Sequence, residues 1–202
     1  MKHAPRLAAL LTVAALALTA CGGDDSADSS AGSTIPASQP FNDADVAFAT
    51  DMIPHHAQAL SMVDLTYKRD LDPAFEKLAG RILDAQGPEI EQMAGWLKDW
   101  DQPVPETGRD HSHADSGEEM DMGGSMPGMM TADEMQQLED APDADFETLW
   151  LQMMIQHHEG AITMAETEVA DGEYADSVAL ARSIAQGQAA EVEGMKAMLA
   201  EQ

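Results

Sequence analysis

The sequence lacks features on which other classes of protein depend. It contains a single cysteine, Cys21, so no disulfide can form within the chain and the fold must be held by its core. Basic residues are scarce: Lys and Arg number 10 against 37 Asp and Glu, which gives a formal charge of −27. Such acidity excludes nucleic acid as a partner and attracts metal cations. Solubility is the simpler interpretation of the same acidity.

Only one long apolar run is present, from Leu7 to Ala20, and it is too short for a transmembrane helix. It follows a basic segment with Lys2 and Arg6, which predicts a signal peptide over residues 1–20. The letters LTAC at its end resemble a bacterial lipobox, whose cysteine carries lipid. We therefore expect an exported protein, anchored through Cys21 to the outer face of the bacterial cell membrane. Cleavage by an ordinary signal peptidase is the alternative.

The rest of the chain is organised by an internal repeat. Residues 21–40 are mostly Ser, Asp, Gly, Ala and Pro, which predicts a disordered tether before a folded domain over 41–202. A shift of 102 residues aligns residues 41–100 with residues 143–202 without a gap. The aligned pairs include Met52 with Met154, His55 with His157, His56 with His158, and Met62 with Met164. An insert over residues 101–142 joins the two repeats.

Strand signals are absent, and each repeat has the apolar periodicity of two helices. We predict an all-α four-helix bundle built from two helical hairpins. The predicted helices span residues 42–68, 73–100, 143–170 and 173–202. Thr131 and Glu134 form a capping-box pattern that predicts a short extra helix before Pro142. Pro54 and Pro88 should bend the first repeat, because proline removes a helical hydrogen bond.

Two adjacent histidines occupy the buried face of the first helix in each repeat. At 100° per residue, His55 and His56 share an arc of about 120° with Met52 and Met62, and the second repeat has the same pattern. Both pairs lie near the middle of their helices, so they should meet at one level whether the helices run parallel or antiparallel. Possible carboxylate partners around them are Asp45, Glu89, Glu147 and Glu191.

Burying four imidazoles without partners costs about 1–3 kcal/mol for each unsatisfied group. The histidines could simply bond to those carboxylates, and the methionines could be core filler. The duplication of the whole pattern favours a metal site instead. The candidate ligands are His55, His56, His157, His158, Met52, Met62, Met154 and Met164.

The insert contains further metal-binding side chains in a stretch, residues 111–130, that is too polar to form core. They are His111, His113, Met120, Met122, Met126, Met129 and Met130. Thioether sulfur selects Cu(I), and imidazole binds both oxidation states of copper. The pattern therefore favours Cu(I), with Cu(II) possible, and disfavours zinc. Compositional drift in a low-complexity segment is the alternative.

The stretches DMIPHHAQALSM and MMIQHHEGAITMA resemble the duplicated motif of the bacterial domain-of-unknown-function family 305. The resemblance covers residues 41–202 and implies an exported, often lipid-anchored protein with a ferritin-like fold. Copper binding by some members implies copper handling here through His55, His56, His157 and His158. Asp51 and Pro54 depart from the methionine-rich version of the motif, so the two half-sites need not be equivalent.

Three functions remain open from the sequence. The first is a copper-binding lipoprotein that sequesters, buffers or transfers the ion without turnover, with an envelope copper-handling protein as a possible partner. The second is a ferritin-like metal-dependent oxidase, but the di-iron pattern Glu-x-x-His is missing, because Met52 and Met154 stand three residues before the histidines. No hydrolase-type nucleophile pattern is visible either. The third is a structural or adaptor bundle without metal.

Overall fold

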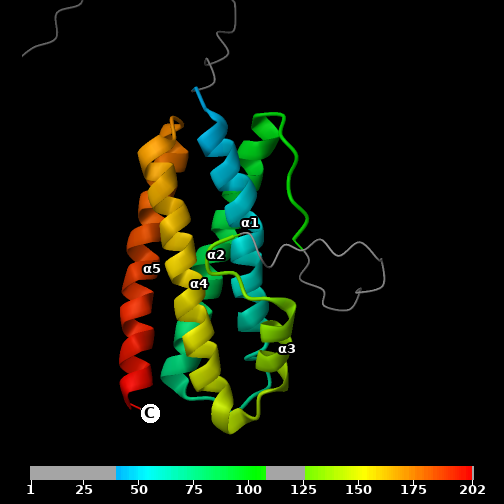
Figure 1. Ribbon diagram of the computed structural model, residues 1–202, viewed down its shortest axis with the longest axis vertical. Coiled ribbons are helices and arrows are strands. Elements are labelled where there is room, and N and C mark those ends of the chain that lie inside the picture. The colour runs from blue at the N-terminus through cyan, green and yellow to red at the C-terminus, as the bar shows by residue number, and fades with distance from the viewer. Residues whose placement is uncertain (1–39, 108–125, 202) are drawn as a thin grey trace, which may run out of the picture. The chain divides into compact units, whose positions relative to one another are not determined.

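The computed structural model describes residues 40–107 and 126–201, all within one compact unit, and their regular structure is entirely helical (Figure 1). The predicted signal peptide, the tether up to residue 39 and Cys21 lie outside the described residues. The helices are α1 (Asp43–Asp64), α2 (Pro73–Asp99), α3 (Ala132–Asp140), α4 (Asp143–Asp171) and α5 (Ala175–Glu201). The all-α class, the four long helices and the short helix before Pro142 are therefore confirmed.

Side chains that precede the helices fix where several of them begin. Asn42 forms a capping box at the start of α1, Asp72 caps α2, and the predicted capping box of Thr131 opens α3. The predicted end of the first helix at residue 68 was wrong, because α1 stops at Asp64. Lys68 has φ of 70°, a left-handed conformation that no α-helix residue adopts.

The two hairpins, α1–α2 and α4–α5, pack mainly through α1 against α4 (Figure 1). Contacts at both ends show that these two helices run antiparallel. The Asn42 side chain before α1 donates to the carbonyl of Asp171 at the end of α4, over 2.8 Å. Beyond the other end of α1, Arg69 bonds to Asp143 at the start of α4, also over 2.8 Å. The antiparallel arrangement settles the orientation that the sequence left open.

Each repeat also completes the start of a helix in the other. The Asp45 carboxylate in α1 accepts hydrogen bonds from the backbone N–H groups of Glu173 (3.2 Å) and Tyr174 (3.0 Å), just before α5. The Glu147 carboxylate in α4 accepts from the backbone N–H of Asp72 (2.7 Å), just before α2. Asp45 and Glu147 are equivalent in the repeat, as are Asp72 and Tyr174. The two hairpins therefore exchange capping groups.

Two apolar clusters fill the bundle, one toward each end. The first contains Phe75, Phe146 and Trp150, and we call this the aromatic end. The second contains Phe48, Trp96, Leu97 and Ile184. Along α1 the second cluster includes Met52 and Ile53, while the first includes Ala59 and Met62. The His-His pair therefore forms a polar layer between two apolar clusters.

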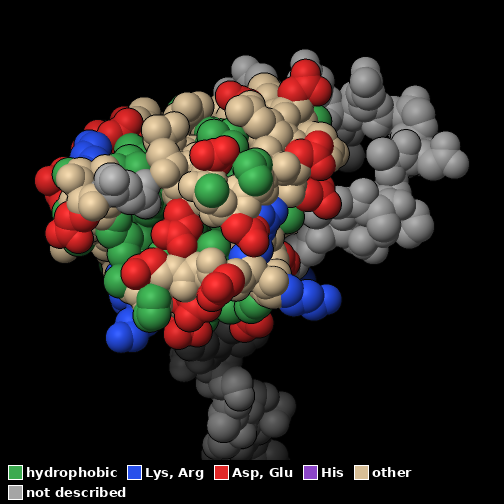
Figure 2. Space-filling model, turned by 90° about the horizontal axis from the view of Figure 1, so that it is seen from below, with side chains coloured by type: hydrophobic (Ala, Val, Ile, Leu, Met, Phe, Trp, Pro, Cys, Tyr) green, Lys and Arg blue, Asp and Glu red, His purple; other side chains and the backbone are tan. Residues whose placement is uncertain are grey.

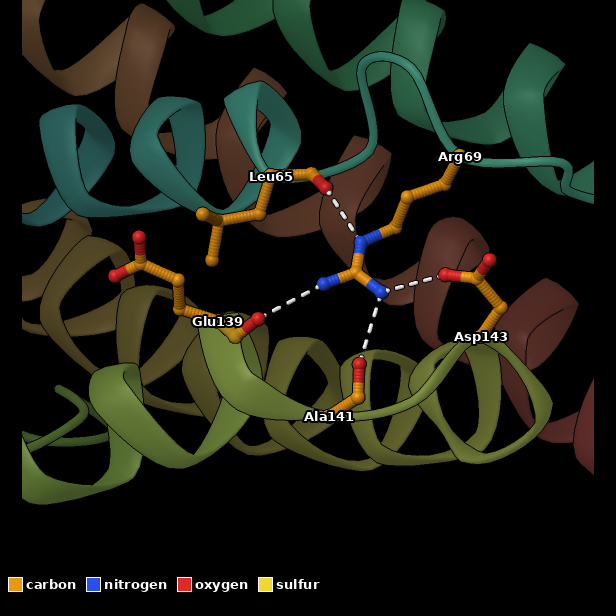
Figure 3. Close-up of polar contacts among 5 residues, drawn as sticks. All are labelled: Leu65, Arg69, Glu139, Ala141 and Asp143. Carbon is orange, nitrogen blue, oxygen red and sulfur yellow. Dashed lines mark hydrogen bonds and ion pairs between the residues drawn. The ribbon is translucent and has the colours of Figure 1, made fainter.

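Arg69 links two loops at the aromatic end through hydrogen bonds (Figure 3). Its guanidinium lies 3.9 Å from the ring centroid of Phe146, close enough for a cation–π contact. The same group joins the loop after α1 to the chain around the α3–α4 junction. Its hydrogen-bond acceptors are the carbonyls of Leu65 (3.1 Å), Glu139 (2.9 Å) and Ala141 (2.9 Å), and the carboxylate of Asp143 (2.8 Å).

The outer surface is acidic. Figure 2, which looks at the bundle from below, shows many acidic side chains and few basic ones between apolar and neutral atoms. Of the helices that the structure describes, none is both long enough and apolar enough to cross a membrane. Pro54 and Pro88 lie inside uninterrupted helices, and the bend that we expect from them stays a prediction.

Candidate metal centre

The four histidines meet in the polar layer, and each has an exposed fraction of 0%. The rings of His55 from α1 and His157 from α4 are in contact and tilted against each other, with centroids 3.9 Å apart and planes at 42°. The centroids of His157 and His158 are 6.4 Å apart. The sequence-based prediction that the imidazoles converge in the middle of the bundle is confirmed.

A carboxylate from the neighbouring helix orients one histidine in each repeat. His56 Nε2 lies 2.8 Å from Glu89 Oε2, and His158 Nε2 lies 2.8 Å from Glu191 Oε2. An ionised carboxylate only accepts hydrogen bonds, so Nε2 is the donor in both rings, and Nδ1 of each has no partner. This is the arrangement that ligating histidines usually have, with one nitrogen for the metal and the other donating to an oxygen.

The third oriented histidine uses a backbone oxygen. His55 Nε2 lies 2.9 Å from the carbonyl oxygen of Pro127. Pro127 belongs to the segment Met126–Met130 at the end of the insert, which we call the strap. His157 differs from the other three, because neither of its ring nitrogens has a hydrogen-bond partner of normal geometry.

Unsatisfied polar atoms are concentrated in this layer. The Nδ1 atoms of all four histidines and Nε2 of His157, five of the eight ring nitrogens, are buried without a partner. The buried side-chain amides of Gln86 and Gln188, one helical turn before Glu89 and Glu191, also have unpartnered atoms. Buried polar groups in native proteins are nearly always bonded. A cluster of free nitrogen lone pairs fits a metal cation.

Burial keeps the rings of His55 and His157 uncharged. The pKa of His55 is lowered to about 4, mainly by desolvation; the hydrogen bond to the Pro127 carbonyl opposes the shift, and the nearby histidines add to it. The pKa of His157 is well below its usual value for the same first cause, with the His55 carbonyl opposing the shift slightly. At neutral pH both rings are therefore neutral, which is the form that binds metals.

The histidine ring nitrogens lie in one layer but do not point at a common centre. Among the described residues, no three His, Cys, Asp or Glu side chains stand in coordination geometry. Thioethers are available nearby, because Met52 and Met154 are fully buried and lie one helical turn before His55 and His157. Binding would require side-chain rotations within the layer.

Two of the four carboxylates that we expected beside the histidines lie elsewhere. Asp45 accepts from backbone N–H groups before α5, and Glu147 accepts from the one before α2. Both are near the starts of their helices, about three turns from the histidines, so neither can reach the polar layer. Only Glu89 and Glu191 have the predicted role of histidine partners.

Met62 and Met164 also lie away from the layer. Each stands seven residues after the first histidine of its pair, which is roughly 10 Å along a helix. Met62 is packed in the cluster of the aromatic end, and Met164 packs against the other cluster. This distance removes them from a shared ligand set with the histidines, and a packing role fits them better.

The insert is only partly described. His111, His113, Met120 and Met122 lie outside the described residues. Of the strap methionines, Met126 and Met129 are half-buried, whereas Met130 has an exposed fraction of 2% and belongs to a core cluster. The prediction that this stretch contributes nothing to the core was therefore wrong for Met130. The Gln58 side chain holds it there, donating to the Met130 carbonyl and accepting from the Met130 N–H.

Sequence reasoning missed the residues that seat the strap, Gln58 and Gly160. The available signal was weak: the shift of 102 residues pairs these two positions, each two residues after a His-His motif. A glycine inside an otherwise regular helix often marks a close backbone approach, and Gly160 does so here.

The family profile and the similar solved structures point to the same protein family. The sequence profile of the family "Domain of unknown function (DUF305)" matches residues 45–199. No curated protein matches the chain. A DUF305 protein from Streptomyces coelicolor, named as secreted, is similar in structure, with 34% identity, a TM-score of 0.67, and coverage of 78% of this chain and 93% of that one.

Two further solved structures are similar. A DUF305 fragment from Deinococcus radiodurans has 29% identity and a TM-score of 0.67, covering 81% of this chain and 99% of its own. CopM in its Cu(II)-bound form has 28% identity and a TM-score of 0.62, covering 78% of this chain and 96% of its own. CopM has also been solved with Cu(I), with Ag and in an apo form.

Proposed function

The chain belongs to the DUF305 family, and from that premise we propose that it is an exported copper-binding protein that holds the ion in the polar layer between α1 and α4. One observation carries the proposal: four fully buried imidazoles meet, and five of their eight ring nitrogens lack a partner. Copper and silver binding by CopM and the export of the Streptomyces protein support it.

The ligands that we assign are the free ring nitrogens and two thioethers. His55, His56 and His158 bind through Nδ1, because Nε2 of each already donates to an oxygen. His157 binds through either nitrogen. Met52 and Met154 lie one turn away and supply soft sulfur ligands, which favours Cu(I) over zinc. A bound ion stabilises lone pairs that are otherwise buried without a partner.

The surroundings of the site fit storage or transfer rather than turnover. The bundle buries the histidines completely, so release of the ion needs local opening, as expected for a buffer or carrier. The insert residues His111, His113, Met120 and Met122 are proposed to capture the ion first. A lipid at Cys21 would keep the protein at the membrane, near an envelope copper-handling partner.

Metal titration tests the proposal. Purified protein is titrated with Cu(I) against a competing chelator, and separately with Cu(II), Zn(II) and Fe(II). We expect the tightest binding for Cu(I). Preference for Fe(II) with oxygen consumption would instead support the oxidase, and failure to bind any of these ions would support the structural bundle.

Two methionine variants make the assignment of ligands sharper. Met52→Leu should weaken Cu(I) binding by at least about tenfold, the loss typical of removing even an outer partner of a metal. Met62→Leu is the matched control, because Met62 is equally buried in the same helix but two turns from the histidines. Equal affinity in the two variants would exclude Met52 as a ligand.

A further inference from the structure

The strap lies directly on the histidine layer and is held there from both sides. In Figure 1 the chain before α3 passes across the middle of the bundle. The Gln58 side chain of α1 donates to the Met130 carbonyl over 2.8 Å and accepts from the Met130 N–H over 2.7 Å. This two-way bond fixes the strap backbone beside the helix that bears His55.

Glycines let the strap approach α4 by its backbone. A Cβ atom on Gly160 would overlap the carbonyl of Pro127. Gly128 has φ of 78°, a conformation that favours glycine, and a Cβ there would lie 2.6 Å from the Gln156 carbonyl oxygen. The strap backbone therefore packs so closely on α4 that neither Gly128 nor Gly160 can carry a side chain. This close packing brings the Pro127 carbonyl to His55 Nε2.

The strap makes the two repeats unequal at the metal centre. Gln58 and Gly160 are equivalent in the repeat, and they face the strap from antiparallel helices. Gln58 hydrogen-bonds to the strap backbone, whereas Gly160 lacks the side chain that would collide with it. One strap serves both, and its carbonyl reaches His55 but gives no partner to His157. The equivalent histidines thus differ: Nε2 of His55 has a backbone partner, and neither ring nitrogen of His157 has a partner of normal geometry.

We propose that the strap is a built part of the metal centre and that Gln58 and Gly160 are positioning residues for His55. The Pro127 carbonyl does for His55 what Glu89 does for His56, holding the proton on Nε2 and leaving Nδ1 for the metal. Without the strap, the His55 ring is free to turn and to exchange its tautomer. The predicted effect on copper affinity rests on the proposed copper site, whereas the predicted effect on the His55 tautomer does not.

The first measurement needs no metal. Nitrogen-15 NMR of histidine-labelled apo protein at neutral pH reports which ring nitrogen carries the proton. We expect His55 in the wild type to be the Nε2–H tautomer. Gly160→Ala, which displaces the strap, and Gln58→Ala, which unclamps it, should each give a mixture of tautomers. Gly194→Ala is the control, because a Cβ there meets nothing within 4 Å.

The second measurement is Cu(I) affinity of the same variants. We expect Gly160→Ala and Gln58→Ala to weaken binding by roughly 10- to 100-fold, as outer partners of ligating histidines do. Gly194→Ala should stay within about twofold of the wild type. Alanine favours the helix over glycine by about 1 kcal/mol, so Gly160→Ala should leave α4 itself intact.

The outcomes separate the two proposals. If both strap variants keep His55 as the pure Nε2–H tautomer, the positioning role is overturned whatever the copper results are. If the tautomer changes and affinity stays within twofold, the strap orients the ring without serving the metal, which also overturns the inference. If the wild type binds no copper, the proposed function fails, while the tautomer data still decide whether the strap fixes His55.

Discussion

The two ends of the bundle are built from equivalent positions of one repeat, yet their interiors differ. At the aromatic end, Phe75 packs against Phe146 and Trp150, with ring centroids 6.5 and 4.8 Å apart. At the other end the residue equivalent to Phe75 is Ser177, which is also fully buried. Between the ends, both repeats carry the same His-His pair with the same carboxylate partner.

The end opposite the aromatic end also buries an acid. Glu168, which is equivalent to Thr66 in the other repeat, has an exposed fraction of 1%. Its pKa is raised to about 7, mainly by burial; the hydrogen bond to Ser177 opposes the shift, and the nearby Asp45 carboxylate adds to it. The ends have thus diverged in chemistry, whereas the middle layer keeps the His-His pair and its carboxylate partner in both repeats and differs in its contact with the strap. This contrast favours the His-His pair, rather than the packing at the ends, as what the two repeats share in function.

The largest effect on copper binding is expected when the histidines of the middle layer are removed. Replacing His55, His56, His157 and His158 together with Leu should lower Cu(I) affinity by at least about 100-fold. Stability at pH 7.5 should stay equal or rise, because five unpartnered ring nitrogens disappear and Glu89 and Glu191 can reach water. Competition titration and chemical denaturation measure the two effects.

The same variant has a pH signature. The pKa of His55 is lowered to about 4 in the fold, so its contribution to stability is present above the unfolded value of 6.5 and is lost as pH falls toward 4. His157 is shifted in the same direction. The variant should therefore lose less stability than the wild type between pH 7 and pH 5. A variant that is less stable than the wild type at pH 7.5 would contradict this account.

The aromatic end can be tested through Arg69. Arg69→Ala should cost roughly 2–4 kcal/mol of unfolding free energy, because three carbonyls, the Asp143 carboxylate and the Phe146 ring lose a charged partner together. Arg81→Ala is the control, since Arg81 is exposed and its hydrogen bond among the described residues is to the Lys77 carbonyl within its own helix. Urea denaturation of both variants gives the difference, and a similar cost for the two would refute the fastening role of Arg69.

The end opposite the aromatic end should give the smallest effect, which develops as pH rises from 4.5 and is nearly complete above pH 7. Because the pKa of Glu168 is raised from 4.5 to about 7, its contribution is full below pH 4.5 and is lost as pH rises through 7. Glu168→Gln, which is always neutral, should match the wild type near pH 4.5 and be more stable by about 1–3 kcal/mol at pH 8. Glu166→Gln, on the exposed side of the same helix, serves as control.

Thermal unfolding at the two pH values measures this difference. A Glu168→Gln variant with the same pH dependence as the wild type would show that the buried carboxyl does not titrate between them.

Much of this architecture could be predicted from the sequence because it is local or repeated. The 3.6-residue period placed His55 and His157 on buried faces, and the shift of 102 residues placed them at one level. The partners of Asp45 and Glu147 could not be predicted, because they depend on which helix start lies beside each carboxylate in space. The strap was missed for the same reason.

The end of α1 shows a different limit. Apolar periodicity continues to about residue 68, but the helix stops at Asp64. Just after the end of α1, Arg69 bonds to the Leu65 carbonyl and to the distant Ala141 carbonyl. These bonds hold the chain in the turn that follows the helix. Local propensity could not reveal it, because the partners around Ala141 lie in another part of the sequence.

The exchanged caps bear on how such a chain could have arisen. Asp45 finishes a helix start that belongs to the second hairpin, and Glu147 finishes one that belongs to the first, so neither hairpin alone satisfies its own amides. Two copies of one hairpin could make the same exchange with each other. The fusion of two such copies in one chain keeps the partners at a fixed ratio and within reach of each other, so the exchange does not depend on protein concentration.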